Sequence, residues 1–202
     1  MMKIVTRLGW FAIFLLILAI LLGIVGCQSK NTFNSIDVTG ATWGKKLSLP
    51  DLDGKYTDLN QYRDNVVAVF FGFLSCPDAC PSSLTTLSRV KDSLGKNENK
   101  FKVIFVSIDA KRDTPEKLKA YLMSFDSEFI GLIAEEKNLD FLKEEFKLVI
   151  QKIQNENVDD FYLIDHTTHI YLFDKNGSLR LVSSQSLSHD ELLSDIKILL
   201  DS

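Results

Sequence analysis

The stretch VVAVFFGFLSCPDACPSSL, residues 66–84, decides the fold of this chain. Val66 to Phe73 are apolar and rich in β-branched and aromatic side chains, which is typical of a central strand covered on both faces. Cys76 and Cys80 follow this strand. Four apolar residues then recur at near-helical spacing: Leu84, Leu87, Val90 and Leu94. They predict a helix that starts at Pro81, because a proline lacks the N–H that a helix interior needs and disfavours helical geometry at the residue before it.

A second apolar run, Lys102 to Ile108, predicts another buried strand after that helix. A strand, a helix and a strand in this order form a β-α-β unit, whose strands lie parallel in one sheet. Ligand sites in such sheets favour the edge at the carboxyl ends of the strands. Cys76 and Cys80 lie at this edge, directly after the first strand.

The rest of the chain alternates short strands with helices, which predicts an α/β fold. A hairpin is expected from Leu47 to Leu49 and the turn at 51–55, with Gly54 in the turn. Further strands are expected at Phe129 to Ala134, Leu148 to Ile153, Ile170 to Phe173 and Leu179 to Val182, the last two joined by a turn at Asp174 to Gly177. Helices are expected from Thr114 and Pro115 to Phe125, from Glu136 to Phe146 and from Ser188 to Leu200.

Residues 1–26 are predicted to be a signal peptide or a membrane anchor. Residues 8–25 form an uncharged apolar run that follows Lys3 and Arg7, which is the profile of an export signal. The run closes with Gly26 and Cys27, a small residue before a cysteine, which resembles the lipobox of bacterial lipoproteins. Cys27 is then the lipid-bearing first residue of the mature chain.

An uncleaved anchor is the alternative, because about 18 apolar residues suffice to span a bilayer, with Lys3 and Arg7 on the cytoplasmic side. Both interpretations place the rest of the chain on the extracytoplasmic face of a bacterial membrane. The polar stretch 27–40 is expected to be a tether, and 41–202 the single folded domain.

The charge balance argues against nucleic acid as a partner. The chain has 202 residues, of which 23 are basic and 27 acidic, and a formal net charge of −4. Lys3 and Arg7 belong to the N-terminal segment, so the predicted domain is more acidic than the whole chain. An acidic domain repels a phosphate backbone.

With Cys27 set aside, Cys76 and Cys80 are the cysteines left in an exported domain. Backbone N–H groups and the positive end of the dipole at a helix N-terminus favour the thiolate and lower the pKa of a cysteine there. A structural disulfide is the alternative. Closing such a short loop removes little freedom from the unfolded chain, so a disulfide between Cys76 and Cys80 would stabilise the fold only slightly. The pair is therefore interpreted as functional.

A third ligand or a proton donor can be sought among three histidines. His189 starts the last helix beside two acidic residues and is expected to be exposed. His166 and His169 lie in FYLIDHTTHIYLF, residues 161–173, between strand-like segments. Strand alternation points these two to opposite sides, so at most one of them faces the cysteines. Spacing alone does not choose between them.

Three motifs resemble those of the Sco/SenC family, thioredoxin-like copper proteins that help to assemble the copper site of cytochrome c oxidase. FFGFLSCPDACPSSL at 70–84 is similar to the family's F-x-F-T-x-C-P-D-x-C-P-x-x-L motif. VSIDAKRDTPEKLKAY at 106–121 and YLIDHTTHIYLFDKNG at 162–177 resemble two further segments of the family. In their order and spacing the three motifs cover most of the chain from about Ala41 to the end.

The resemblance implies a thioredoxin-like fold. Together with the elements above, this gives a central mixed sheet flanked by helices, with an N-terminal hairpin and a membrane anchor segment. It also implies that Cys76, Cys80 and His166 bind copper, since they match the family's ligands, whereas His169 falls on a variable position. The implied partner is the copper-site subunit of cytochrome c oxidase. Another copper donor and a thiol reductase are further partners compatible with the same chemistry.

The ligand types agree with copper. Two thiolates and one imidazole form a soft set of low coordination number suited to Cu(I), and Cu(II) also fits if a water or a carboxylate completes a fourth position. Zinc competes, although a structural zinc site normally has four protein ligands. Asp78 and Asp165 are interpreted as solvated loop carboxylates, with tuning of the site's charge or orientation of His166 as the alternative. Asp109 and Asp113 are interpreted as loop residues without a chemical role.

Two functions use the same cysteines. A copper chaperone binds and delivers copper without turnover of a small substrate, and a mobile loop at Asn155 to Asp160 would let the imidazole of His166 come and go. A thiol–disulfide oxidoreductase instead attacks a partner's disulfide with Cys76 and resolves it with Cys80. His166 discriminates between them, because a reductase does not need it. Phe73, where the peroxiredoxin motif has a threonine, argues against a peroxidase.

Overall fold

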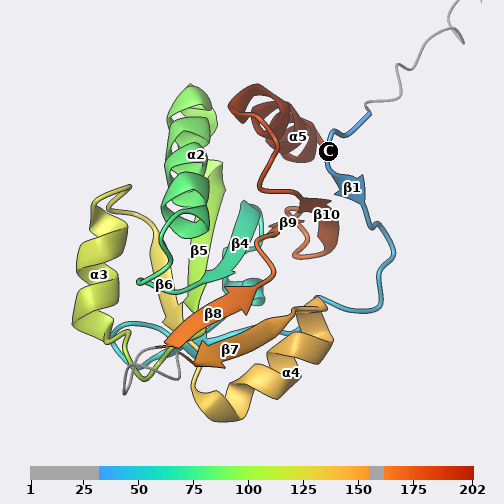
Figure 1. Cartoon of the computed structure of the whole chain (residues 1–202). Helices are drawn as coiled ribbons and strands as arrows, with labels where there is room; N and C mark the ends of the chain where they lie inside the picture. Colours follow the sequence, from blue (N-terminus) through green and yellow to red (C-terminus); the bar gives the residue numbers. More distant parts are fainter. Residues whose placement is uncertain (1–31, 155–161) are drawn as a thin grey trace, which may run out of the picture. The chain divides into compact units, whose positions relative to one another are not determined.

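Helices lie on both sides of a six-stranded sheet in the computed structural model of the chain, which describes residues 32–154 and 162–202 (Figure 1). The strand order is β1-β10-β9-β4-β5-β6. The bounds are β1 Ile36–Asp37, β4 Val66–Gly72, β5 Phe101–Ser107, β6 Ile130–Ile133, β9 Ile170–Phe173 and β10 Leu179–Ser183. Strands β4, β5 and β6 are parallel, whereas β9, β10 and β1 pair antiparallel. The sheet is therefore mixed, as expected.

Strand β4 lies between two hydrophobic cores. Every residue of β4 is buried. Val67, Val69 and Phe71 belong to the core on one face of the sheet. Val66 and Phe70 belong to the core on the other face. Because both faces are covered, the sequence of β4 is continuously apolar instead of alternating. Each fully buried phenylalanine stabilises the fold by about 1.5–3 kcal/mol.

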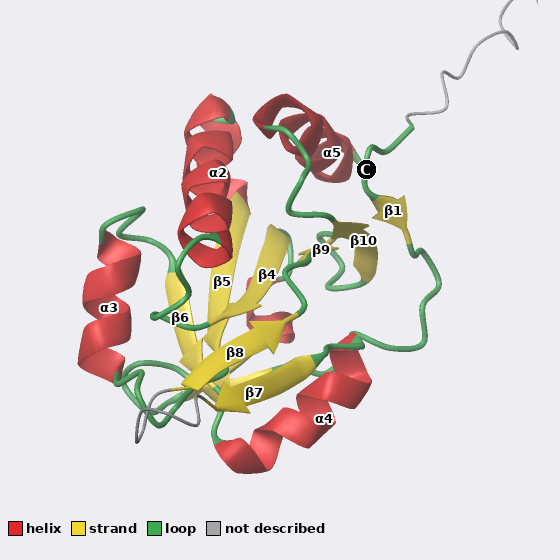
Figure 2. Cartoon of the chain, viewed as in Figure 1, coloured by secondary structure: helices red, strands yellow, loops and turns green. Residues whose placement is uncertain are grey.

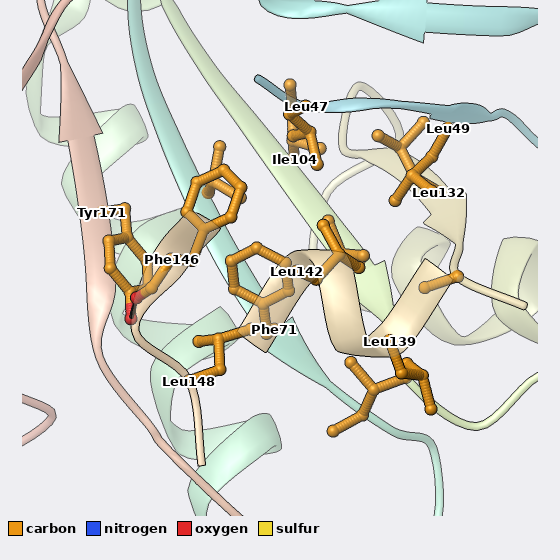
Figure 3. Close-up of a cluster of buried hydrophobic side chains, with 14 of the residues drawn as sticks. Leu47, Leu49, Phe71, Ile104, Leu132, Leu139, Leu142, Phe146, Leu148 and Tyr171 are labelled. Atoms are coloured by element: carbon orange, nitrogen blue, oxygen red, sulfur yellow. Dashed lines mark hydrogen bonds between the residues drawn. The ribbon is translucent and has the colours of Figure 1, made fainter. Parts of the chain in front are cut away.

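One face of the sheet is covered by three helices, α2, α3 and α5 (Figure 2). Their bounds are α2 Ala79–Ser93, α3 Pro115–Met123 and α5 His189–Asp201. The other face is covered by α4 and by two small hairpins, β2–β3 and β7–β8. Their bounds are α4 Glu136–Phe146, β2 Ser48–Pro50, β3 Tyr56–Asp58, β7 Ile150–Gln154 and β8 Tyr162–His166. Figure 3 shows α4 packing Leu142 and Phe146 against Phe71 and Ile104 of the sheet. Two short 3-10 helices, Leu59–Tyr62 and Gly95–Lys100, complete the described elements.

Most of the predicted elements are confirmed. Helix α4 and strand β9 have the predicted bounds, and the parallel β4-α2-β5 unit is present. Asp174 and Gly177 form the predicted turn between β9 and β10, with a positive φ of 74° at Gly177. Ser188 caps α5 through a capping box with Glu191, because its hydroxyl accepts from an N–H group that the helix leaves unpaired.

The predicted start of the first long helix is wrong. Helix α2 begins at Ala79, so Cys80 and Pro81 both lie in its first turn. The first N–H groups of a helix have no intrahelical acceptor, so a proline in this turn removes no hydrogen bond. The preference against helical geometry before a proline is overridden here, and Cys80 becomes a helical residue.

Two strands were not predicted. Ile36 pairs with Val182, so part of the stretch 27–40 belongs to the folded sheet, and the fold begins before residue 41. Strand β8 ends at His166, whereas β9 begins at Ile170 in a different sheet. The alternation argument for the two histidines therefore does not apply, because they do not lie on one strand.

Within the described ranges, no helix is long and apolar enough to cross a bilayer. The predicted signal peptide or anchor at 1–26, Cys27 and the predicted loop at Asn155 to Asp160 lie outside the described residues.

Candidate metal centre

The two cysteines occupy the turn that connects the central strand to helix α2. After β4 the chain turns at Phe73, whose carbonyl accepts from the N–H of Cys76 at 3.2 Å. The backbone N–H of Cys80 then donates to Sγ of Cys76 at 3.4 Å. Cys80 is fully buried and Cys76 is partly exposed, and both are free thiols. The exposed sulfur therefore lies at the N-terminus of a helix, where an anion is stabilised.

Gly72 makes room for the buried thiol. A Cβ atom at this position would lie 2.6 Å from Sγ of Cys80 and 2.9 Å from the ring of Phe105. Both separations are below van der Waals contact, so any larger residue would displace the sulfur. Gly72, the last residue of β4, therefore forms part of the pocket that holds the Cys80 side chain.

His166 reaches the cysteines from β8. Its Nδ1 lies 2.9 Å from the carbonyl oxygen of Thr167, which only accepts hydrogen bonds, so Nδ1 carries the proton. Nε2 then has a free lone pair, and it lies 3.9 Å from Sγ of Cys80. The ring of Phe73 meets the imidazole edge to face, with centroids 5.6 Å apart. The Thr167 carbonyl therefore orients the imidazole, whereas Asp165 is exposed as expected.

The ligand atoms of Cys76, Cys80 and His166 all lie within 4.8 Å of one another. His169 is exposed in the connection from β8 to β9 and is not part of this group. His189 is half-buried instead of exposed, and it contacts Ser93 of α2 through Nε2 at 3.1 Å. The structure thus brings together the three residues that the motifs imply. Two sulfurs and one imidazole nitrogen suit a soft cation of low coordination number.

The two thiols differ in acidity. The pKa of Cys76 falls to about 5, because the Cys80 thiol donates a hydrogen bond to its sulfur, with further help from backbone N–H groups and His166. The pKa of Cys80 is raised, because its proton is held by the Cys76 sulfur and because burial disfavours its thiolate. At neutral pH the pair therefore carries one negative charge, and this charge is on the sulfur of Cys76.

A groove of about 370 Å³ gives access to the site. Phe73, Cys76 and His166 line its inner part, and Ile153 and Leu163 of the β7–β8 hairpin line its outer part. Ile153 is 49% exposed and Leu163 46%, and the exposed carboxylates of Asp78 and Asp165 also line the groove, so its accessible surface combines apolar and acidic groups. A ligand or a protein partner can therefore approach Cys76 without displacing the core.

Two acidic residues interpreted as plain loop residues are buried. Asp109 and Asp113 are each 2% exposed, and their carboxylates hydrogen-bond to groups on both sides of the site. Thr114 behaves as expected and caps α3 by accepting from the N–H of Lys117 at 3.4 Å. The sequence held one signal for a role of Asp109 at the site: this residue follows the end of a buried strand, at the same edge of the sheet as the cysteines.

The family model described as SCO1/SenC matches residues 38–201. An SCO2-like protein of Rickettsia prowazekii is 36% identical over 134 residues, which are 66% of this chain and 65% of that protein. The chain therefore belongs to the SCO1/SenC family. The matched stretch spans slightly less than two thirds of the length of this relative.

Solved structures agree with this assignment. The copper-bound structure of ScoI from Bradyrhizobium japonicum is 33% identical, with a TM-score of 0.68, and the match covers 76% of this chain and 96% of that one. The thioredoxin domain of a thiol-disulfide oxidoreductase from Bacteroides vulgatus has a TM-score of 0.54 at 19% identity, over 76% of this chain and 92% of that one. This second likeness concerns the fold alone and confirms that the fold is thioredoxin-like.

Proposed function

We propose that this protein is a copper chaperone that binds copper through Cys76, Cys80 and His166. It delivers the metal to the copper site of cytochrome c oxidase, or prepares that site. The observation that carries the proposal is the convergence of two sulfurs and one imidazole nitrogen from separate segments within 4.8 Å. Family membership and the copper-bound relative from Bradyrhizobium japonicum support copper as the metal.

Cu(I) is the form that this site suits best. Two thiolates and one imidazole give a soft, three-coordinate set, whereas Cu(II) would need a water or one of the nearby carboxylates as a fourth ligand. A structural zinc site normally has four protein ligands, which this group lacks. In this proposal copper is cargo, so the site must release it as well as bind it.

The proposal places the domain outside the cytoplasm, on a bacterial membrane. Cys27 carries the lipid anchor, or residues 1–26 remain as a single transmembrane helix. A Cys27→Ser substitution tests this choice, because it should block lipid labelling and signal cleavage only if Cys27 is the lipidated residue. The partner is the copper-site subunit of cytochrome c oxidase. Further partners are another copper donor, which would load the site with metal, or a thiol reductase, which would keep its cysteines reduced.

A thiol–disulfide oxidoreductase is the second candidate, and the acidity of Cys76 favours it. Its thiolate would attack a partner's disulfide, forming a mixed disulfide and releasing one partner thiol. The Cys80 thiolate would then displace the second partner thiol, leaving a Cys76–Cys80 disulfide and a reduced partner. The imidazole of His166 has no necessary part in this exchange.

Anaerobic Cu(I) titration of the reduced protein tests the proposal, with disulfide reduction measured on the same sample. The wild type should bind one copper, more weakly as pH falls because protons compete for the thiolates. His166→Ala should weaken copper retention and abolish maturation of the oxidase, while exchange with a small disulfide stays nearly unchanged. His169→Ala is the matched control, and it should leave both unchanged. Normal oxidase assembly with His166→Ala would favour the reductase instead.

A further inference from the structure

The histidine and the cysteines are attached to separate sheets. Cys76 and Cys80 follow β4 of the six-stranded sheet, whereas His166 ends β8, whose described backbone pairing is with β7. The described parts of the β7–β8 hairpin form a two-stranded sheet of their own. The separation of the imidazole from the sulfurs therefore depends on side-chain contacts and on the short connection after His166.

One turn contacts both halves of the site. Residues 108–114 connect β5 to α3, and this turn is anchored to the cysteine side by Asp113. The Asp113 carboxylate accepts from the N–H of Leu74 at 3.1 Å and from the hydroxyl of Ser107 at 2.6 Å. Leu74 lies in the turn between β4 and Cys76, so Asp113 fixes the backbone that leads to the cysteines.

The same turn is anchored to the histidine side by Asp109 and Arg112. The Asp109 carboxylate accepts from the Tyr162 hydroxyl at 2.5 Å and pairs with Arg112. Arg112 donates from Nη1 to the carbonyl of Tyr162 at 2.8 Å, and its guanidinium lies 3.8 Å from the centre of the Tyr162 ring. Tyr162 is the first residue of β8. The guanidinium also lies 5.7 Å from the ring of Phe73, which in turn contacts His166.

We propose that Asp109, Arg112 and Tyr162 are positioning residues that hold the His166 strand at the distance from the cysteines at which one metal ion is shared. The inference rests on the proposed function for the identity of the metal. The contacts are charge-assisted, and Asp109 is almost fully buried, so the contacts stabilise one arrangement of the hairpin relative to the sheet. Groups that orient metal ligands in this way typically affect metal affinity by about 10–100-fold.

Tyr162→Phe tests the proposal, because it removes one hydroxyl and keeps the ring that packs under Arg112. Cu(I) affinity of the full-length reduced protein is measured by competition with a chromogenic Cu(I) chelator. The expected loss is about tenfold, the lower end for groups that act on a ligand through another residue. Tyr171→Phe is the matched control, since its buried hydroxyl donates to the Phe146 carbonyl at 2.8 Å in the core. This control should lose stability but keep copper affinity.

A double-mutant cycle separates positioning from general stability. In a His166→Ala background, Tyr162→Phe should cause no further loss of affinity, because the group that it positions is absent. A loss that persists in this background, or an equal loss in Tyr171→Phe, would overturn the proposal.

A metal-free measurement keeps the positioning proposal separate from the copper proposal. In the apo protein, Tyr162→Phe should speed amide hydrogen exchange in residues 162–169 while leaving β4 unchanged. Unchanged exchange in residues 162–169 would overturn the positioning role. A wild type that fails to bind Cu(I) would overturn the proposed function instead, and the exchange result would still decide the role of Tyr162.

Discussion

The two halves of the metal centre are built on different supports. The cysteine half leaves β4, which is buried throughout and paired on both sides. The histidine half ends a hairpin whose β7 strand is mostly exposed. The thiols thus sit on the most constrained part of the sheet and the imidazole on a less constrained one. In the proposed chaperone function this difference would let the thiolates keep the metal while the imidazole of His166 leaves it.

Amide hydrogen exchange should show the largest difference between the two supports. Amides of β4 and β5 should be protected at least about 1,000-fold more than those of β7 and β8, because core strands exchange only through near-global opening. Mass spectrometry of peptides from the metal-free protein measures this ratio. Similar protection in both regions would remove the structural basis of the comparison.

Within the cysteine half, the two sulfurs should differ in reactivity on the order of 100-fold. Cys80→Ser leaves the partly exposed Cys76, whereas Cys76→Ser leaves the buried Cys80. Alkylation of the two reduced, metal-free variants with iodoacetamide near neutral pH measures the difference. Comparable rates would show that the buried sulfur is accessible and that the division of roles within the pair is incorrect.

The rate of Cys76 alkylation should be nearly independent of pH around neutrality, unlike that of an ordinary thiol. The pKa of Cys76 is lowered to about 5, so its thiolate persists above that pH. The rate should be nearly constant between about pH 6 and 8 and should fall about tenfold per unit well below pH 5. An unperturbed thiol would show a rate that rises about tenfold per unit between pH 6 and 8. The experiment uses the wild type without metal, and a rise of that kind would contradict the hydrogen-bonded pair.

The smallest of the expected effects concerns Gly72. Gly72→Ala should displace Sγ of Cys80 and lower Cu(I) affinity about tenfold, with a stability loss of about 1–3 kcal/mol from overpacking. Gly131→Ala is the matched control, since its Cβ would lie 3.0 Å from Leu122 of α3, in the core. Thermal unfolding should show that Gly131→Ala is destabilised about as much as Gly72→Ala, whereas its copper affinity should be unchanged. An equal loss of affinity in both variants would mean that Gly72 acts only through the stability of the fold.

Much of the fold was predictable because local patterns dominate it. The continuous apolar run of β4 and the capping residues Thr114 and Ser188 each report a local energetic requirement that the structure meets. The start of α2 was mispredicted because a local rule about proline competes with the packing of a whole helix. Strand β8 was missed because its burial alternates but its sequence does not: Leu163 is apolar and yet 46% exposed, so Tyr162 to His166 shows no period of two.

The sequence by itself determined the α/β class, the cysteine pair after a buried strand and, through its motifs, the resemblance that selects His166 over His169. It did so because strand, helix and turn preferences act over a few residues. Only the tertiary structure decided that the Thr167 carbonyl orients the imidazole, that Gly72 seats Cys80, and that one turn contacts both halves of the site. These features join residues far apart in the chain, and such contacts depend on how the hairpin packs against the sheet, which no local pattern encodes.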